Sequence, residues 1–217
     1  MRKIKIFTVL VLAVALACGA VGVSYAAKGK VKKEVSTDLT PQERFELAFY
    51  VYADAKSPLN HFAPSGWMGD SKDLYFNQSW TQNVHAGKSC IKVQYNPKGS
   101  DRWTGIYWQQ PQGNWGDKEG GYDLSKATFV TFWLKGEIGN EVIQEIKIGG
   151  FKGAFPDSGT AVKKNIKLTN QWKLYFIDLR NVDTSYIAGG FSFVVSRRDN
   201  PNGCVFYMDE IRYEMEK

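Results

Sequence analysis

The chain has 217 residues with 28 Lys/Arg against 22 Asp/Glu, a formal net charge of +6, and 14% of its residues are aromatic. Residues 1–38 hold seven of the basic and two of the acidic residues, which leaves 21 basic and 20 acidic residues, a net of +1, for residues 39–217. A body that close to neutral lacks the positive charge with which proteins neutralise nucleic-acid phosphates, so we expect no nucleic-acid partner.

The first 26 residues have the pattern of a secretory signal peptide. Three basic residues precede an uncharged, mostly apolar run over 6–23, and Ser24-Tyr25-Ala26 places small residues at the two positions that signal peptidase reads. We expect cleavage after Ala26 and a secreted protein, periplasmic or extracellular, with no stable membrane insertion. Two alternatives stay open. The apolar run is long enough to span a bilayer of roughly 30 Å as an uncleaved anchor, and Cys18 could be lipidated, although alanine replaces the usual leucine of that motif.

Residues 27–40 are expected to form a basic flexible linker, because the lysine cluster at 28–33 favours a solvated tether. The remaining residues, 41–217, are about as many as one ordinary domain needs to bury its own core. At the start of this domain, Thr40-Pro41-Gln42-Glu43 has a capping-box pattern with proline at the first helical position, which predicts a short helix.

A series of strand candidates separated by Gly, Pro, Asn and Asp follows, and several alternate apolar and polar residues with period two. Such a series without intervening helices predicts an all-β fold, a single antiparallel β-sandwich of two sheets. The candidates are roughly 48–54, 89–95, 105–110, 128–135, 143–148, 164–168, 173–179, 191–196 and 205–213.

Two cysteines remain in the body of the chain, Cys90 and Cys204. An exported protein could join them in a disulfide. Both lie at strand starts, however, and neighbouring antiparallel strands start at opposite ends. We therefore favour two free, semi-buried thiols over a bridge.

The segment Trp103–Trp115, WTGIYWQQPQGNW, combines flat rings with neutral amides, a mixture that folding alone rarely requires. Sugars stack their C–H faces on flat rings and offer hydroxyls to amides, so this mixture suits a polysaccharide or oligosaccharide ligand. Trp108 is expected in the core. The candidate ligand-binding residues are Trp103, Tyr107, Gln109, Asn114 and Trp115.

A second aromatic candidate is Trp67, within a segment over 60–70 that is rich in turn residues and is expected to be a loop. A tryptophan between Gly66 and Gly69 is hard to bury by local packing, so Trp67 is a candidate for another stacking ring.

The last strand offers a different kind of candidate. Alternation of Ile211 and Tyr213 toward the core, extended backward, turns Asp209 inward as well. A carboxylate on a core-facing position is costly unless it is paired or bound to a cation. A structural Ca²⁺ held by Asp209 and by Asp54 would satisfy it; hydrogen bonds to the backbone or to Lys/Arg are the equal alternative.

Four stretches of the chain resemble the strands of carbohydrate-binding modules with a jelly-roll, galactose-binding-like β-sandwich: SCIKVQY, FVTFWLKG, QWKLYFIDL and the ending PNGCVFYMDEIRYE. The resemblance covers most of residues 48–215, although each motif is short. It implies a non-catalytic module that binds sugar on a concave sheet face or at loop tips, through Tyr107 and Gln109 or through Trp67 and Trp115. It also implies a structural calcium at Asp209 and Asp54. Such modules usually accompany a catalytic domain, and the sequence shows none.

Enzymatic signatures are sparse. The chain has only His61 and His85, no G-x-S-x-G motif and no His/Cys cluster with zinc spacing. The adjacent acids Asp209 and Glu210 point to opposite faces of a strand, unlike the paired carboxylates of a glycosidase. We therefore expect an exported, non-catalytic and monomeric polysaccharide-binding protein. One alternative is an enzyme of jelly-roll fold: a lyase that uses Tyr or His with Arg102 to neutralise charge, or a glycoside hydrolase. The other is an extracellular scaffold that binds another protein.

Overall fold

Eleven strands and one short 3₁₀ helix make up the regular structure of residues 48–216, the part of the chain that this computed structural model describes. The expected signal peptide, the basic linker, Cys18 and the short helix at residues 40–43 lie outside the described residues. Within residues 48–216, no helix is long and apolar enough to cross a membrane.

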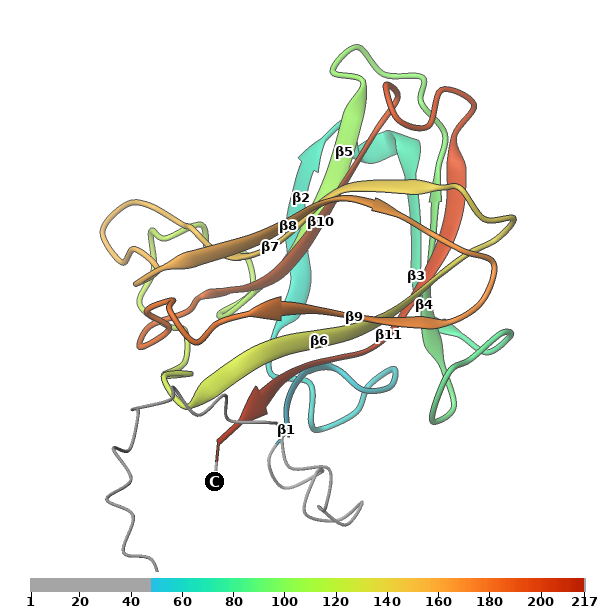
Figure 1. The fold of residues 1–217 in the computed structure, drawn as a ribbon. Helices are drawn as coiled ribbons and strands as arrows, with labels where there is room; N and C mark the ends of the chain where they lie inside the picture. Colours follow the sequence, from blue (N-terminus) through green and yellow to red (C-terminus); the bar gives the residue numbers. More distant parts are fainter. Residues whose placement is uncertain (1–47, 217) are drawn as a thin grey trace, which may run out of the picture. The chain divides into compact units, whose positions relative to one another are not determined.

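The strands form two antiparallel sheets that pack face to face (Figure 1). Sheet A has the order β3-β4-β11-β6-β9, and β1 pairs with the C-terminal part of β11. Sheet B has the order β2-β5-β10-β7-β8. The all-β antiparallel sandwich predicted from the sequence is confirmed. The strands of sheet A are β1 (Ala48–Tyr52), β3 (Leu74–Trp80), β4 (Cys90–Tyr95), β6 (Ala127–Gly136), β9 (Lys173–Asp178) and β11 (Cys204–Met215). Those of sheet B are β2 (Ala63–Gly69), β5 (Trp103–Gln109), β7 (Val142–Gly149), β8 (Thr160–Lys167) and β10 (Gly189–Ser196).

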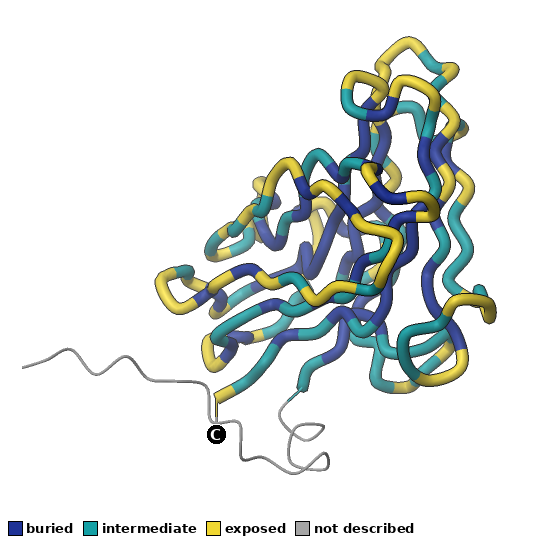
Figure 2. Tube along the Cα trace, turned by 45° about the vertical axis from the view of Figure 1, so that its right-hand side comes forward, coloured by how far each residue is buried: buried dark blue, intermediate teal, exposed yellow. Residues whose placement is uncertain are grey.

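The core lies between the two sheets and follows the period-two alternation of the strands. Buried and less buried positions alternate along β6, whereas most of β10 is buried (Figure 2). Aromatic rings from both sheets meet in this core: Trp108 of sheet B contacts Phe76 of sheet A, and Phe193 of sheet B contacts Phe206 of sheet A. Burial of such large rings dominates the stability of a sandwich of this size.

Two strands were not predicted. The segment expected to be a loop over residues 60–70 contains strand β2, so that expectation is wrong, and β3 was missed altogether. Gly66 explains the first error: a Cβ on it would lie 2.7 Å from Cβ of Tyr107, so glycine there permits close strand packing rather than a turn. β2 is an edge strand, which also explains why it tolerates Pro64.

Strand β11 contains a bulge that reverses which residues face the core. Its register with β6 shifts between Asp209 and Arg212, and Glu210 has a left-handed φ of 48°. Met208 faces the core before the bulge and Ile211 after it. Asp209 lies opposite Trp133 on the outer face of sheet A. The expectation that Asp209 faces the interior of the sandwich is therefore wrong, because the alternation does not run unbroken through the bulge.

Both cysteines are free thiols, as predicted. Cys204 pairs with Tyr95 at one end of β4, whereas Cys90 begins that strand at its other end. Burial raises the pKa of each thiol to about 12, which makes both unreactive at neutral pH.

Candidate functional site on the outer face of sheet B

Strand β5 separates a core side from an outer side of sheet B. Ile106 and Trp108 are buried in the main core, so the alternate residues Trp103, Gly105 and Tyr107 point to the outer face. The outer face continues onto β10 and β7 through the cross-strand pairs of Tyr107 with Ser192 and of Ser192 with Lys147. This face carries residues of the segment Trp103–Trp115, which the sequence predicts to bind sugar.

Trp103 stands at one end of this face. Its side chain is 36% exposed, and its ring packs on Gly69 of the neighbouring strand, where a Cβ would lie only 3.0 Å from the indole. Gly69 has a φ of +60°, which glycine adopts without strain. The glycine therefore lets the indole lie close to the backbone of β2 while part of the ring stays open to solvent.

Trp115 stands at the other end and is 42% exposed. Its ring centre lies 6.0 Å from that of Tyr107 and 5.5 Å from that of Phe151. Tyr107, Phe151 and Ala188 form a small buried cluster outside the main core. This cluster gives Trp115 a rigid support beneath an open ring.

The loop that presents Trp115 is held by Asn114, which is fully buried. Its side-chain amide donates to the carbonyl oxygens of Gln110 and Lys118 at 3.2 and 2.9 Å. Its side-chain oxygen accepts from the backbone N–H groups of Gly116 and Lys118 at 2.9 and 3.2 Å. All the hydrogen-bonding capacity of this side chain is thus used inside the loop.

Gln109 and Tyr107 are occupied in the same way. Nε2 of Gln109 donates to the carbonyl of Asn114 at 2.7 Å, and its Oε1 accepts from the hydroxyl of Ser65 at 2.7 Å. The hydroxyl of Tyr107 donates to the carbonyl of Gly149 at 2.8 Å, and burial strongly raises the pKa of Tyr107. The direct ligand contacts predicted for Tyr107, Gln109 and Asn114 do not fit these buried positions. These residues instead support the two open indoles. We call Trp103, Trp115 and the buried residues beneath them the Trp103–Trp115 platform.

Trp67 is 44% exposed but belongs to a different surface. Its cross-strand partner is Ile106, a core residue, so its ring points to the inner side of edge strand β2. There it packs edge-on against Phe76 of sheet A at 6.0 Å. The structure therefore brings together Trp103 and Trp115, but not Trp67, on one face.

Between the two open indoles, the face is formed by Gly105 and its cross-strand neighbours Met68 and Val194. Four residues along β5 from Trp103 to Tyr107, the support of Trp115, correspond to about 14 Å at 3.4 Å per residue. Ser192, the cross-strand partner of Tyr107, is buried, and its hydroxyl donates to the carbonyl of Lys147 at 3.2 Å. Among the described residues, no hydrogen bond engages the indole N–H of Trp103 or of Trp115. The face offers two flat rings and two free donors, together with the Lys147 ammonium 5.9 Å from the ring centre of Tyr107.

The two aspartates proposed as calcium ligands anchor a loop instead. Asp54 accepts hydrogen bonds from the backbone N–H groups of Lys88 and Ser89 at 2.8 and 2.7 Å. Asp209 accepts from the N–H groups of His85 and Ala86 at 3.0 and 3.2 Å. Burial, only partly offset by these bonds, raises the pKa of Asp209 to about 7.

Calcium takes about six to eight oxygen ligands. Residues 48–216 contain no group of three or more His, Cys, Asp or Glu side chains that could hold a metal, and Asp209 already faces N–H donors. The residues present do not fit the expected structural calcium. They fit the alternative, in which Asp209 accepts backbone hydrogen bonds.

The two histidines lie in separate aromatic stacks. His61 stacks on Phe49 at 3.8 Å between ring centres, and His85 stacks on Trp133 at the same distance. His85 belongs to the outer face of sheet A, where burial lowers its pKa. Neither ring lies among the residues of the Trp103–Trp115 platform.

Comparison with solved structures places the fold among carbohydrate-binding modules. A crystal structure of a family 30 carbohydrate-binding module matches with a TM-score of 0.54 and 18% identity, over 80% of this chain and 90% of that chain. The family 30 carbohydrate-binding module of a cellulosomal cellulase of Clostridium thermocellum matches with a TM-score of 0.51 and 18% identity, over 79% of this chain and 99% of that one.

No protein-family model and no curated protein sequence matches the chain. At 18% identity the structural likeness shows the fold alone. It confirms the β-sandwich fold that the resemblance of the strand motifs implies.

Proposed function

We propose that the protein binds a polysaccharide on the outer face of sheet B and does not act on it chemically. The observation that carries the proposal is the pair of partly open indoles: Trp103 at the start of β5, and Trp115 on the loop that packs against Tyr107 near the end of β5. A sugar ring placed on either indole gains apolar contact over its C–H face, while its hydroxyls reach polar groups at the ring edge.

The spacing of the two rings favours a chain over a single sugar. About 14 Å of strand separates their anchoring points, and the buried Gln109 and Asn114 keep the Trp115 loop in one conformation. A preformed platform binds with less loss of conformational entropy than a mobile one. We therefore infer that one oligosaccharide segment contacts both indoles.

Two further lines support the proposal. The fold is shared with family 30 carbohydrate-binding modules. The histidines, one of which a Ser–His–Asp hydrolase would need, are engaged in ring stacks away from Trp103 and Trp115. The signal-peptide pattern at residues 1–26 supports a secreted protein that meets its polysaccharide outside the cytoplasm, and we propose that it acts as a monomer.

Affinity electrophoresis in gels that contain different polysaccharides tests the proposal. We expect at least one polysaccharide to retard the protein, and Trp103→Ala and Trp115→Ala each to weaken retention about tenfold, the effect of losing roughly 1.4 kcal/mol of stacking. Phe176→Ala is the matched control, since that ring is 52% exposed on sheet A.

Incubation of the same purified protein with these polysaccharides, and with candidate protein partners, tests the alternatives. Release of reducing or unsaturated ends from the retarding polysaccharide would indicate a hydrolase or a lyase. Retention of a protein partner without retention by any glycan would indicate a scaffold. Normal retention of both indole variants would refute the proposed site.

A further inference from the structure

A lysine shares the outer face of sheet B with the two open indoles. Ile146 and Ile148 of β7 face the main core, so Lys147 between them points to the outer face. Its cross-strand partner on β10 is Ser192, which in turn pairs with Tyr107 of β5. Lys147 therefore lies two strands away from Tyr107, in the same row across the sheet and on the same side.

The side chain of Lys147 ends near the Trp115 end of the platform. A Cβ on Gly150 would lie 2.7 Å from Cε and 2.9 Å from Nζ of Lys147, so the end of the lysine rests on this glycine. The ammonium is 5.9 Å from the ring centre of Tyr107, and the ring centre of Trp115 is 6.0 Å from the same ring. The ammonium and the open indole of Trp115 thus flank one buried ring.

The charge of Lys147 is not neutralised by the part of the chain that the structure describes. Lys147 takes part in none of the ion pairs within residues 48–216. At 5.9 Å from the ring centre, its contact with Tyr107 lies at the outer limit of a cation–π interaction. The side chain is partly exposed, so a ligand on the face can reach it.

Two carboxylates lie near the hydroxyl of Tyr107, those of Asp157 and Glu145, and both are engaged within the fold. Glu145, two residues before Lys147 on the same face, pairs with Lys164 at 3.6 Å. Asp157 accepts hydrogen bonds from three backbone N–H groups at 2.9, 2.6 and 3.3 Å. The acids of this region therefore leave the ammonium of Lys147 to a ligand.

We propose that Lys147 binds the oxyanion of an acidic polysaccharide whose sugar rings stack on the Trp103–Trp115 platform. This inference rests on the proposed function and names the class of glycan. A carboxylate or a sulfate ester accepts a charge-assisted hydrogen bond from the ammonium, which is roughly twice as strong as a bond between neutral groups. A neutral hydroxyl leaves the charge uncompensated. A uronic acid or a sulfated sugar that covers Trp115 thus places its negative group at Lys147.

Binding to matched charged and uncharged glycans tests this inference on the purified protein. Polygalacturonate and its methyl ester share the same sugar backbone and differ in charge, and dextran sulfate compared with dextran gives the sulfate arm. We expect about tenfold tighter binding to one acidic member than to its neutral counterpart, the effect of one charge-assisted hydrogen bond. The affinity should also fall as salt is raised, because added ions screen the ammonium.

Lys147→Gln should bring the affinity for the acidic member down to that for its neutral counterpart, whereas Lys147→Arg, which keeps the charge, should retain most of the preference. Lys92→Gln is the matched control, because Lys92 is also partly exposed and its ammonium lies over a ring, that of Trp80, on sheet A. The control should keep the full preference, and the melting temperatures of all three variants show whether each is folded.

The outcomes separate this inference from the proposed function. No preference for either acidic member, or a preference that persists in Lys147→Gln, overturns the acidic-glycan inference; retention by a polysaccharide that still depends on Trp103 and Trp115 then leaves the proposed function intact. Retention by an acidic glycan that needs Lys147 but is indifferent to both indole variants overturns the proposed function and, with it, this inference.

Discussion

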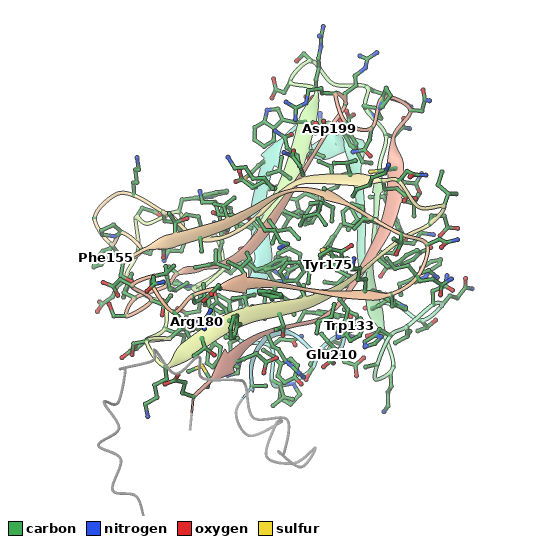
Figure 3. The ribbon with its side chains drawn as sticks, viewed as in Figure 1. Trp133, Phe155, Tyr175, Arg180, Asp199 and Glu210 are labelled. Carbon is green, nitrogen blue, oxygen red and sulfur yellow. The ribbon has the colours of Figure 1, made fainter. Side chains whose placement is uncertain are left out.

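The outer faces of the two sheets both carry indoles, but they use them differently. On sheet A, Trp133 is stacked on His85 at 3.8 Å, and the indole N–H of Trp172 donates to the carbonyl of Asn83 at 3.0 Å. On sheet B, Trp103 and Trp115 are 36% and 42% exposed. Figure 3 labels Trp133 beside the strands of sheet A.

The cover of sheet A comes from one loop and from lysine side chains. The loop over residues 81–89 is anchored by Asp54 and Asp209 and supplies His85 and Asn83. The ammonium of Lys92 lies 3.9 Å from the ring centre of Trp80. The number of tryptophans on a face is therefore a poor guide to binding; what matters is whether the chain itself already occupies their faces.

The largest expected effect on stability comes from Asp209, which anchors the loop over residues 81–89. The pKa of Asp209 is raised from 3.8 to about 7 in the fold, so the unfolded chain loses this proton first as the pH rises. The free energy of unfolding should fall between about pH 4 and pH 7, by up to about 4 kcal/mol at 1.36 kcal/mol per pKa unit.

Asp209→Asn should remove this part of the pH dependence. Urea unfolding of both proteins from pH 4 to pH 8 measures it, and the readout is the slope, since the substitution also changes stability at every pH. Identical slopes for the two proteins would contradict a buried, protonatable Asp209.

The second largest expected effect on stability comes from Asn114, which holds the loop that presents Trp115. Asn114→Ala removes four hydrogen bonds of a fully buried side chain, and we expect a loss of about 3 kcal/mol in unfolding free energy. Gln112→Ala, at an exposed position of the same loop, should change it by less than about 0.5 kcal/mol. Equal stability of the two variants would show that the loop does not depend on Asn114.

A smaller effect should separate stability from binding. Trp133→Ala removes a half-buried indole from the His85 stack, and we expect a loss of about 2 kcal/mol in unfolding free energy. Retention by polysaccharide should stay at the wild-type level, because the ring lies on sheet A. Weakened retention in this variant, with the protein still folded, would place the binding surface on sheet A instead.

The smallest effect is expected from chelation. Since Asp54 and Asp209 accept backbone N–H groups, EDTA should leave the melting temperature unchanged, whereas removal of a bound structural ion lowers it. A drop in melting temperature that is absent in Asp209→Ala would restore the calcium expectation.

Much of the fold follows from alternation along single strands. The strand of Phe191 and Phe193 could be predicted because its pattern is local and strong. β2 could not, because the reason for Gly66 is the approach of Tyr107 from another strand. The bulge at Glu210 is likewise invisible in the sequence, and it moved Asp209 to the other face.

The candidate site was predicted in part, for similar reasons. Local composition identified the open rings Trp103 and Trp115. It could not separate them from Gln109 and Asn114, whose hydrogen bonds depend on how the loop folds back.

Nuclear magnetic resonance of the indole N–H groups tests the central claim most directly. The chain contains seven tryptophans, and each gives one indole signal that a bound glycan shifts only when it lies close by. Titration with an oligosaccharide of the retarding polysaccharide should move the signals of Trp103 and Trp115 and leave those of Trp133 and Trp172 in place. Shifts confined to Trp133 and Trp172 would contradict the account.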